Sequence, residues 1–560
     1  MKKKMFKLIS VLLVAMLLLS ACSTSGGDAT ETVAANPEQG NSAESPPAGG
    51  NNAPASDKPE IDVVMPVPEL VSELSDETLT VAVESEPRTL AGFFSGEPGT
   101  AAQQIGMCLT DPLTHYNSQT GEVEMTGTLS GFERIDDYRV RCFLREGLIS
   151  YGGNVITAND LVEATKLVLQ INEGGTTHVM IDPEKVYVED EFTFVLGTYD
   201  IYPTFTDLFT QGDWIPAICM AEVNALGGAD AVHTNPNVGC GKYYLDEWVP
   251  GQYVQLVRND NYWDQDNLPY YKYLKCVFIN DSATRALALQ AGDVDLIFGI
   301  SGTQIEGLGN IPGLYVEAAP TINTISVFMN TSKAPFNDEN FRKAVRMLID
   351  YEGLIQLATN GRALTAQTSF SRANIYYLKD YKNFPDGGPF IDDAKALLAQ
   401  TSYNGEALDI LCEQLQEEEV QYFQACMLAG GININISVTD SLPAIMGSGE
   451  YDMIYQPVYG TNAARVLNRY DGRVPPNEAS GGAQYRDDPV FEAIIDIARY
   501  DNDDAARLKA YQEVQQYVID KCIMIGLYCT VIFNAHNDNI RVAQHTPAGA
   551  AEMWSVAPVA

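Results

Sequence analysis

The sequence predicts an α/β protein with more than one domain, in which mixed sheets are flanked by helices. The chain has 560 residues, which is too long for one compact core, because single cores stop growing at about 250–300 residues. Hydrophobic residues make up 46% of the chain, and this fraction is ample for globular folding. Short apolar runs alternate with patterns of helical period, and such helix–turn–strand units build sheets with helices on their outer faces.

The first 22 residues predict an export signal. Four lysines among the first seven residues precede the apolar run Leu8–Leu19, which is too short to span a bilayer as a permanent helix. The run ends in Leu19-Ser20-Ala21-Cys22, which resembles the bacterial lipobox, where cleavage before the cysteine leaves its thiol to carry a lipid. The resemblance implies an extracytoplasmic protein held to the cell membrane by a lipid on Cys22. An ordinary signal peptide with an incidental cysteine is the alternative.

Residues 23–76 are predicted to form a disordered linker. The segment is rich in Ser, Gly, Ala, Asn, Pro and Glu and has no periodic apolar pattern. Such a composition cannot bury enough surface to offset the entropy of ordering. As a flexible coil, the segment would act as a spacer between the membrane and the folded body.

The charge of the chain excludes two classes of partner. Acidic residues outnumber basic ones by 74 to 35, which gives a net charge of −39. Nucleic-acid binding needs a basic face, and broad attachment to anionic lipid needs clustered cations. Solubility is the ordinary explanation of such a charge, and attraction of a cationic ligand is the functional alternative.

No motif in the sequence indicates catalysis, a cofactor or a metal. Elements such as G-x-S-x-G, H-E-x-x-H and a P-loop are absent, and the five histidines are scattered. With Cys22 set aside, nine cysteines remain without a CxxC pair, whereas a metal cage needs clustered ligands. Buried free thiols are the ordinary interpretation, and some disulfide pairing after export is the alternative.

The folded body is predicted to begin near Thr78, with a buried strand at Leu79–Val83. A hairpin over residues 132–140 follows, and then a helix that Thr157 and Asp160 begin as a capping box. The remaining elements are, in order, strands at 191–197, 242–248 and 252–258, a helix at 284–291, strands at 294–300 and 325–330, a helix at 341–350, a strand at 408–412, a helix at 418–428, strands at 432–438 and 451–455, and a helix at 504–519. An apolar run at 521–534 follows, and the apolar residues at 540–545 come last.

Three motifs between Asn235 and Ile300 resemble one family. The chain reads V-G-C-G-K-Y from Val238, R-N-D-N-Y-W from Arg258 and A-L-Q-A-G-D-V-D from Ala288. The family 5 extracellular solute-binding proteins, of the oligopeptide- and dipeptide-binding type that serve ABC importers, usually read G-T-G-P-Y, R-N-P-x-Y-W and A-L-Q-x-G-E-x-D at these points. The order and spacing of the motifs match, and we interpret Gly239, Gly241, Tyr262 and Trp263 as structural.

The resemblance implies a two-lobed, periplasmic-binding-protein-like fold with an extra small domain and a hinged cleft. Lobe I would consist of three segments, residues 77–90, 216–322 and 527–560. Residues 91–215 would form the extra α+β subdomain, and residues 323–526 would form lobe II. The implied function is capture of a small solute, above all an oligopeptide, and its delivery to the permease subunits of an ABC transporter. A surface receptor without transport is the alternative, and an exported hydrolase is a second one that the missing motifs disfavour.

The predicted ligand site departs from the peptide-binding pattern. Family members that bind peptides hold the amino terminus with an Asp just after the strand equivalent to Tyr451–Tyr455, often in W-x-x-D-Y-x-D-P. No Asp occupies Gln456–Arg465 here, and a buried ammonium without an anion would cost several kcal/mol. Asn462 or a carboxylate from the loop after the first strand could replace it, and Arg465 could hold a carboxylate instead. The predicted ligand-binding residues are Glu84, Glu86, Arg88, Tyr455, Tyr459, Asn462 and Arg465, with an ordinary solvated or packing role as the alternative for each.

Overall fold

The protein is represented by a computed structural model. The structure describes residues 69–71, 73–91, 100–117, 123–171, 180–199, 215–300, 302–372, 374, 376–382, 387–439, 442–458, 463–474, 485–546, 549 and 551–560. All of them belong to one body, residues 60–560. Within these ranges no helix is both long and apolar enough to cross a membrane. The predicted signal, Cys22 and the linker up to residue 68 lie outside the described residues.

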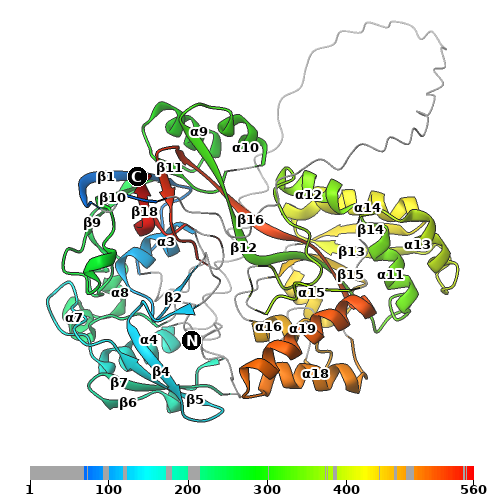
Figure 1. Ribbon diagram of the computed structural model, residues 1–560, viewed down its shortest axis with the longest axis horizontal. Helices are drawn as coiled ribbons and strands as arrows, with labels where there is room; N and C mark the ends of the chain where they lie inside the picture. The colour runs from blue at the N-terminus through cyan, green and yellow to red at the C-terminus, as the bar shows by residue number, and fades with distance from the viewer. Residues whose placement is uncertain are drawn as a thin grey trace, which may run out of the picture. The chain divides into compact units, whose positions relative to one another are not determined.

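A ten-stranded sheet runs through the body. Its strands are ordered β14 (Asn433–Val438), β13 (Ala407–Cys412), β15 (Met453–Val458), β12 (Leu314–Met329), β16 (Met524–Asn537), β11 (Leu296–Ile297), β1 (Ser75–Val83), β10 (Tyr271–Phe278), β9 (Tyr253–Arg258) and β8 (Tyr243–Val249). We call β13–β15 with their helices the β15 half of the sheet, and β1 with β8–β11 the β1 half. The long strands β12 and β16 belong to both halves and run side by side between them (Figure 1).

The pairing of β12 with β16 is interrupted at its middle. Leu314–Pro320 pairs with residues 531–537 of β16 in the β1 half, and Thr324–Phe328 pairs with residues 524–529 in the β15 half. Between Pro320 and Thr324 the register shifts, and the hydroxyls of Thr321 and Thr530 share a hydrogen bond of 2.5 Å. We call this interruption the crossing. A bulge bends a strand pair locally, and a second register shift, between Ile325 and Ser326, lies next to the crossing in the β15 half.

The parallel strands of both halves run toward the crossing. In the β1 half, Leu296 and Ile297 of β11 lie opposite His536 and Ala535, so β11 and its parallel neighbour β1 advance toward the crossing. In the β15 half, β15 runs from Met453, opposite Met329, to Val458, opposite Thr324 and nearer the crossing. Strand β13 runs parallel to β15. The carboxyl ends of both sets of strands therefore face the same place.

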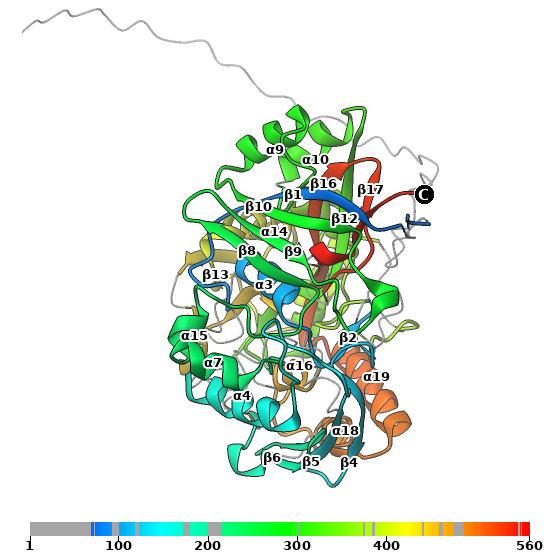
Figure 2. The ribbon, with the colours of Figure 1, turned by 90° about the vertical axis from the view of Figure 1, so that its left-hand side faces the viewer.

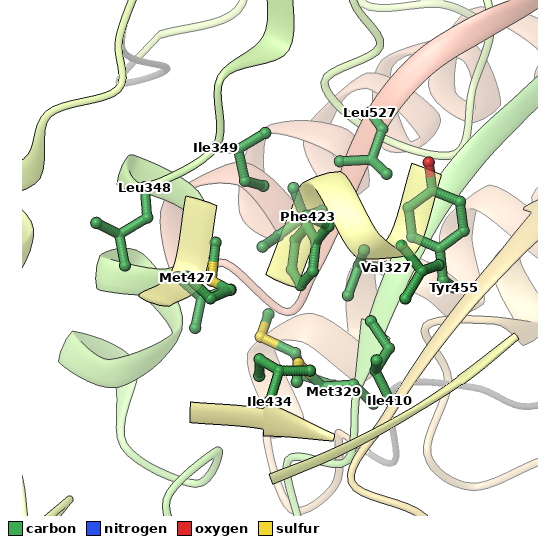
Figure 3. Close-up of a cluster of buried hydrophobic side chains, with 14 of the residues drawn as sticks. Val327, Met329, Leu348, Ile349, Ile410, Phe423, Met427, Ile434, Tyr455 and Leu527 are labelled. Carbon is green, nitrogen blue, oxygen red and sulfur yellow. The ribbon is translucent and has the colours of Figure 1, made fainter. Parts of the chain in front are cut away.

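Alternate side chains of the β15 half build a core on each face of the sheet. One core includes Val327, Ile410, Tyr455 and Phe423 (Figure 3) and is covered by α11 (Glu339–Met347), α12 (Tyr351–Thr359), α13 (Ile391–Leu398) and α14 (Glu417–Gly430). The opposite core includes Phe328 and Ile454 and is covered by α15 (Leu442–Ser448), α16 (Ala463–Asn468), α18 (Pro489–Tyr500) and α19 (Asp504–Lys521). The strands are buried on both faces, as expected where helices flank a sheet.

A separate four-stranded sheet follows β1 in the chain. Its order is β4 (Leu129–Arg134), β5 (Arg139–Leu144), β7 (Thr193–Gly197) and β6 (Tyr187–Asp190), and α4 (Ala158–Ile171) lies next to it (Figure 2). Asp160 accepts hydrogen bonds from the backbone N–H and hydroxyl of Thr157, which confirms the predicted start of α4. The other elements include α3 (Thr100–Leu109), β2 (His115–Tyr116), β3 (Val123–Glu124), α7 (Met220–Leu226), α8 (Ala229–Val232), α9 (Ser282–Ala291), α10 (Gly302–Gly309), β17 (Ile540–Val542) and β18 (Val556–Pro558).

Several predicted elements have other bounds in the structure. The strand predicted at 325–330 is the end of β12, which begins at Leu314, and the strand predicted at 451–455 is shifted to Met453–Val458. Two further differences have a clear local cause. The helix predicted to reach Asp350 ends at Met347, because the Asp350 carboxylate accepts from the Gly353 N–H and caps α12 instead. The strand predicted over residues 294–300 is paired only at Leu296–Ile297, since Gly299 turns the chain with a φ of +63°. A side-chain cap and a glycine turn set these boundaries, and apolar periodicity registers neither.

The tight packing around Gly526 of β16 gives a testable prediction about stability. A Cβ atom there would lie 2.6 Å and 2.7 Å from the backbone oxygen and nitrogen of Thr368, and backbone atoms cannot move aside as a flexible side chain can. Gly526→Ala is expected to lower the free energy of unfolding in urea by about 1–3 kcal/mol. Gly307→Ala in α10 is the matched control, because a Cβ there meets nothing within 4 Å and should stabilise the helix. Equal stability of the two variants would contradict the close approach.

Candidate functional site

The carboxyl ends that face the crossing define the candidate functional site. In open α/β sheets, ligands bind at the carboxyl ends of the strands. Here the ends of β1 and β11 from one half and of β13 and β15 from the other converge there. A solute at this place could touch both halves of the sheet at once.

Glu419 is a partly buried acidic side chain of the β15 half near this edge. It lies in the first turn of α14, which begins soon after the carboxyl end of β13. One carboxylate oxygen accepts hydrogen bonds from the hydroxyls of Tyr455, at 2.5 Å, and Tyr528, at 2.8 Å. Burial raises the pKa of Glu419, and the two tyrosine hydrogen bonds lower it in part. A raised pKa beside the carboxyl ends of the strands makes this carboxyl a candidate functional group.

The two tyrosines reach Glu419 because of where their strands place them. Tyr455 pairs with Val327 on β12, and Tyr528 pairs with Ile325 two residues nearer the crossing. Phe423 packs edge-on against Tyr455, with ring centroids 6.5 Å apart. Both hydroxyls thus come from rigid strands, and they fix the position of the carboxylate.

Glu419 has no cation paired with it among the residues that the structure describes. Its second oxygen has no hydrogen-bond donor within the same set of residues. A carboxylate that is partly desolvated in this way binds a cation more strongly than one in water. The arrangement therefore suits a ligand ammonium group, which supplies both the charge and the hydrogen-bond donors that are missing.

The opposite face of the same edge also carries a buried polar group. Gln456 of β15 lies opposite Ser326 and is 6% exposed. Its side-chain nitrogen Nε2 finds no hydrogen-bond acceptor among the described residues. Buried donors are satisfied in nearly all proteins. The edge of β15 thus holds an acceptor on one face and a donor on the other.

The predicted ligand-binding residues are distributed unevenly. Tyr455 is fully buried and contributes only its hydroxyl, through Glu419. Glu86 accepts from the indole N–H of Trp248 and the backbone N–H of Gly251, which ties it to the β8–β9 turn. Glu84 and Arg88 are exposed after the carboxyl end of β1. Tyr459, Asn462 and the side chain of Arg465 lie outside the described residues.

Glu419 and Gln456 are the two residues of the edge that sequence analysis missed as site residues. A signal for Glu419 was present, because it stands in a run of three glutamates that follows a buried strand and opens a helix. The first turn of a helix favours acidic residues for electrostatic reasons of its own, so the run alone does not distinguish Glu419 from its neighbours.

A second buried polar cluster, in the β1 half, is structural. The Asp111 carboxylate accepts from the hydroxyl of Tyr262 at 2.8 Å, from the indole of Trp263 at 2.9 Å and from Lys242 at 3.4 Å. Gly241 lies so close to the backbone of Leu109 that any Cβ there would clash. The predicted structural roles of Gly241, Tyr262 and Trp263 are confirmed, because each holds the β8–β9 hairpin against the end of α3.

Glu552, beside this cluster, gives a pH prediction. Burial raises its pKa from 4.5 to about 7, and Lys242 lowers it in part. The folded protein therefore holds a proton that the unfolded chain releases, so the contribution of Glu552 to stability is full below pH 4.5 and is lost as pH rises through 7. Between pH 4.5 and 8, the free energy of unfolding of the unmodified protein should fall by up to about 3 kcal/mol more than that of the Glu552→Gln variant. Glu513→Gln, at an exposed carboxyl in α19, should leave the pH profile unchanged.

Cysteines and metal ligands add nothing to the site. The nine cysteines within the described residues are free thiols, eight of them buried. Over the same part of the chain, no group of three or more His, Cys, Asp or Glu side chains is placed to hold a metal ion. The edge therefore draws its polar groups from other side chains, which include Glu419, its two tyrosines and Gln456.

Comparisons with known proteins agree with this architecture. Residues 130–469 match the family model described as bacterial extracellular solute-binding proteins, family 5 middle. The chain is 25% identical over 316 residues to the nickel-binding periplasmic protein of Escherichia coli, in a match that covers 52% of this chain and 59% of the relative. It is also 25% identical over 375 residues to the glutathione-binding protein GsiB of Salmonella paratyphi A, covering 64% of this chain and 70% of the relative. The first of these matches thus spans little more than half of the relative.

Among solved structures, the fold resembles that of MppA, a periplasmic murein tripeptide binding protein in its unliganded open form. The TM-score is 0.76 at 17% sequence identity, and the match covers 88% of this chain and 99% of the other. At this identity the likeness concerns the fold alone. It confirms the predicted two-lobed α/β fold with helix-flanked sheets.

Proposed function

We propose, from the premise that the chain belongs to the family 5 bacterial extracellular solute-binding proteins, that it captures a small solute outside the cytoplasm and delivers it to the permease of an ABC transporter. An oligopeptide with a free amino terminus is the solute that the site suits best. The protein binds this solute without changing it chemically. A lipid on Cys22 and the spacer of residues 23–76 would keep it at the cell membrane.

The single observation that carries the proposal is the position of Glu419. The loop after β15 has no Asp between Gln456 and Arg465, so a peptide ammonium needs another anion. Glu419 offers a partly buried carboxylate, held by two tyrosines, at the carboxyl edge of the same half of the sheet. Pairing with an ammonium would offset the desolvation that raises its pKa.

The crossing supplies the closing movement. We propose that residues 77–90, 216–322 and 527–560 form lobe I, that residues 91–215 form an added subdomain, and that residues 323–526 form lobe II. Only β12 and β16 pass between the lobes within the ten-stranded sheet, and both change register at the crossing. A hinge needs few residues that absorb a change of backbone angle. Closure about the crossing would bring the ends of β1 and β15 onto the solute.

Native mass spectrometry of the purified chain tests the proposal directly. We expect a co-purified peptide whose dissociation lowers the unfolding temperature. A library of peptides, sugars, amino acids and metal chelates provides the second test. A true ligand at a hundredfold excess over its Kd should stabilise the protein by about 2.7 kcal/mol. If no solute raises the unfolding temperature, the proposal of solute capture is wrong.

A further inference from the structure

A hollow of about 660 Å³ opens on the β15 half and is lined by basic side chains. Its lining residues are Arg372, Tyr377, Lys379, Asp380, Tyr381 and Lys382. Three of these six residues are cationic and one is anionic. The chain as a whole has 74 acidic and 35 basic residues. The hollow therefore carries the opposite charge to the rest of the protein.

The surrounding sequence shows the same bias. Between Gly353 and Phe384 the only acidic residue is Asp380, whereas four residues are basic. Among the residues that the structure describes, Arg372, Lys379 and Lys382 form no ion pair with a carboxylate. Uncompensated like charges repel one another, and gathering them is unfavourable unless an anion binds among them.

The segment that carries these cations is fixed by α19. The side chain of Gln515 accepts from the Leu378 N–H at 3.0 Å and donates to the Tyr376 carbonyl at 2.7 Å. Gln516 does the same for both backbone groups of Lys382, at 2.9 Å and 3.0 Å. A backbone held at both ends does not have to be ordered by its ligand, and this raises affinity.

One buried glutamine orients the two tyrosines of the hollow. Gln367, 5% exposed, accepts from the Tyr377 hydroxyl at 3.0 Å and donates to the Tyr381 hydroxyl at 2.6 Å. Burial raises the pKa of Tyr377 to about 12, and the adjacent Arg372 guanidinium lowers it. Arg372 thus lies close to a fixed aromatic side chain and lines the hollow together with it.

Arg372 also connects the hollow to the crossing. The hydroxyl of its neighbour Ser371 donates to the Thr321 carbonyl at 2.6 Å, inside the interrupted stretch of β12. The Nε atom of Arg372 is buried and has no hydrogen-bond acceptor among the described residues. A guanidinium with an unused donor beside the hinge is suited to a planar anion, which it can bind with two hydrogen bonds.

We propose that this hollow binds an anionic group of the captured solute, a cluster of carboxylates or a phosphate, with Arg372 as its main anchor and Lys379 and Lys382 as supporting charges. The inference rests on the proposed function, because it names a charge that the solute carries. It assigns to lobe II a second polar contact, of opposite sign to Glu419. Because Arg372 is tied to the crossing, an anion held there would also favour one setting of the hinge.

Calorimetric titration of the purified chain with citrate and with inorganic phosphate, at constant ionic strength, tests this site. We expect binding of at least one anion, and an affinity that is at least about tenfold lower in Arg372→Gln. Binding should be lost in Arg372→Gln combined with Lys379→Gln. Lys343→Gln is the matched control, because Lys343 is a half-buried cation of the same half that already pairs with Glu339. This control should bind as the unmodified protein does.

The two anions distinguish the source of the charge. Citrate alone indicates a solute with carboxylates, phosphate alone indicates a phosphorylated solute, and both together indicate recognition of charge. Failure of both anions to bind at about 10 mM, or equal binding by the Arg372→Gln variant, would overturn the inference. A library ligand whose affinity is unchanged in Arg372→Gln would overturn it as well, while solute capture stands. Anion binding without any library ligand would count against solute capture instead.

Discussion

Replacing Asp111 with alanine is expected to lower the free energy of unfolding by about 3–5 kcal/mol, because it leaves a buried cation without its anion. The side chains of Asp111 and Lys242 are 2% and 4% exposed. The Lys242 ammonium has two hydrogen-bond partners, the Tyr262 hydroxyl at 2.9 Å and Asp111 at 3.4 Å, and it lies over the ring of Trp554. Without Asp111, the neutral Tyr262 hydroxyl is the hydrogen-bond partner that remains, and Glu552 is a carboxyl that still interacts with Lys242. Urea unfolding followed by tryptophan fluorescence measures the loss.

Removing both charges should cost less than removing one. The variant that combines Asp111→Leu with Lys242→Met replaces the ion pair by apolar side chains of similar volume, and such replacements are often nearly neutral. We therefore expect the double variant to be more stable than Asp111→Ala alone. Asp246→Ala, at an exposed position on β8, serves as the control and should change stability by less than about 0.5 kcal/mol. A double variant as unstable as the single one would show that packing, and not the buried charge, sets the cost.

The Asp111 cluster shows what local sequence patterns can and cannot predict. The β8–β9 hairpin was predictable because Gly251 adopts a φ of +73°, which a glycine in a Pro-Gly turn readily takes. The end of α14 was predictable for the same reason, since Gly431 has a φ of +92°. The pairing of Lys242 with Asp111 joins residues 131 positions apart. No periodicity within one element contains that information.

The candidate site, too, was predictable from local sequence only in part. The departure from the peptide-binding pattern at Gln456–Arg465 was readable in the sequence, because the expected Asp is absent there. Its replacement was sought in nearby loops, at Glu84, Glu86 and Asn462. Glu419 instead reaches the edge through α14, because β13 and β15 are neighbours and both end there. Strand order, which the sequence does not state, decides which helix can supply the carboxylate.

Glu419→Gln is expected to weaken binding of a peptide with a free amino terminus by at least about thirtyfold in Kd. Truncating one side of a desolvated charge pair costs about 2–5 kcal/mol, and glutamine keeps the shape and the acceptor oxygen for Tyr455 and Tyr528 while losing the charge. The same peptide with an acetylated amino terminus carries no ammonium. The affinity for the acetylated peptide should be low, and it should be the same in the unmodified protein and in Glu419→Gln. Calorimetry with both peptides isolates the charge from the packing.

The stability of the Glu419→Gln variant without ligand separates a binding role of Glu419 from a structural role. Burial raises the pKa of Glu419, and no cation among the described residues offsets that desolvation, so Glu419→Gln should leave the free energy of unfolding unchanged or raise it. A residue that weakens binding when replaced, yet costs nothing in stability, is held for its ligand, because selection for folding alone would not keep it. Glu418→Gln, an exposed neighbour in the same helical turn, should change neither quantity. Unchanged peptide affinity in Glu419→Gln would move the ammonium site to the loop after β1.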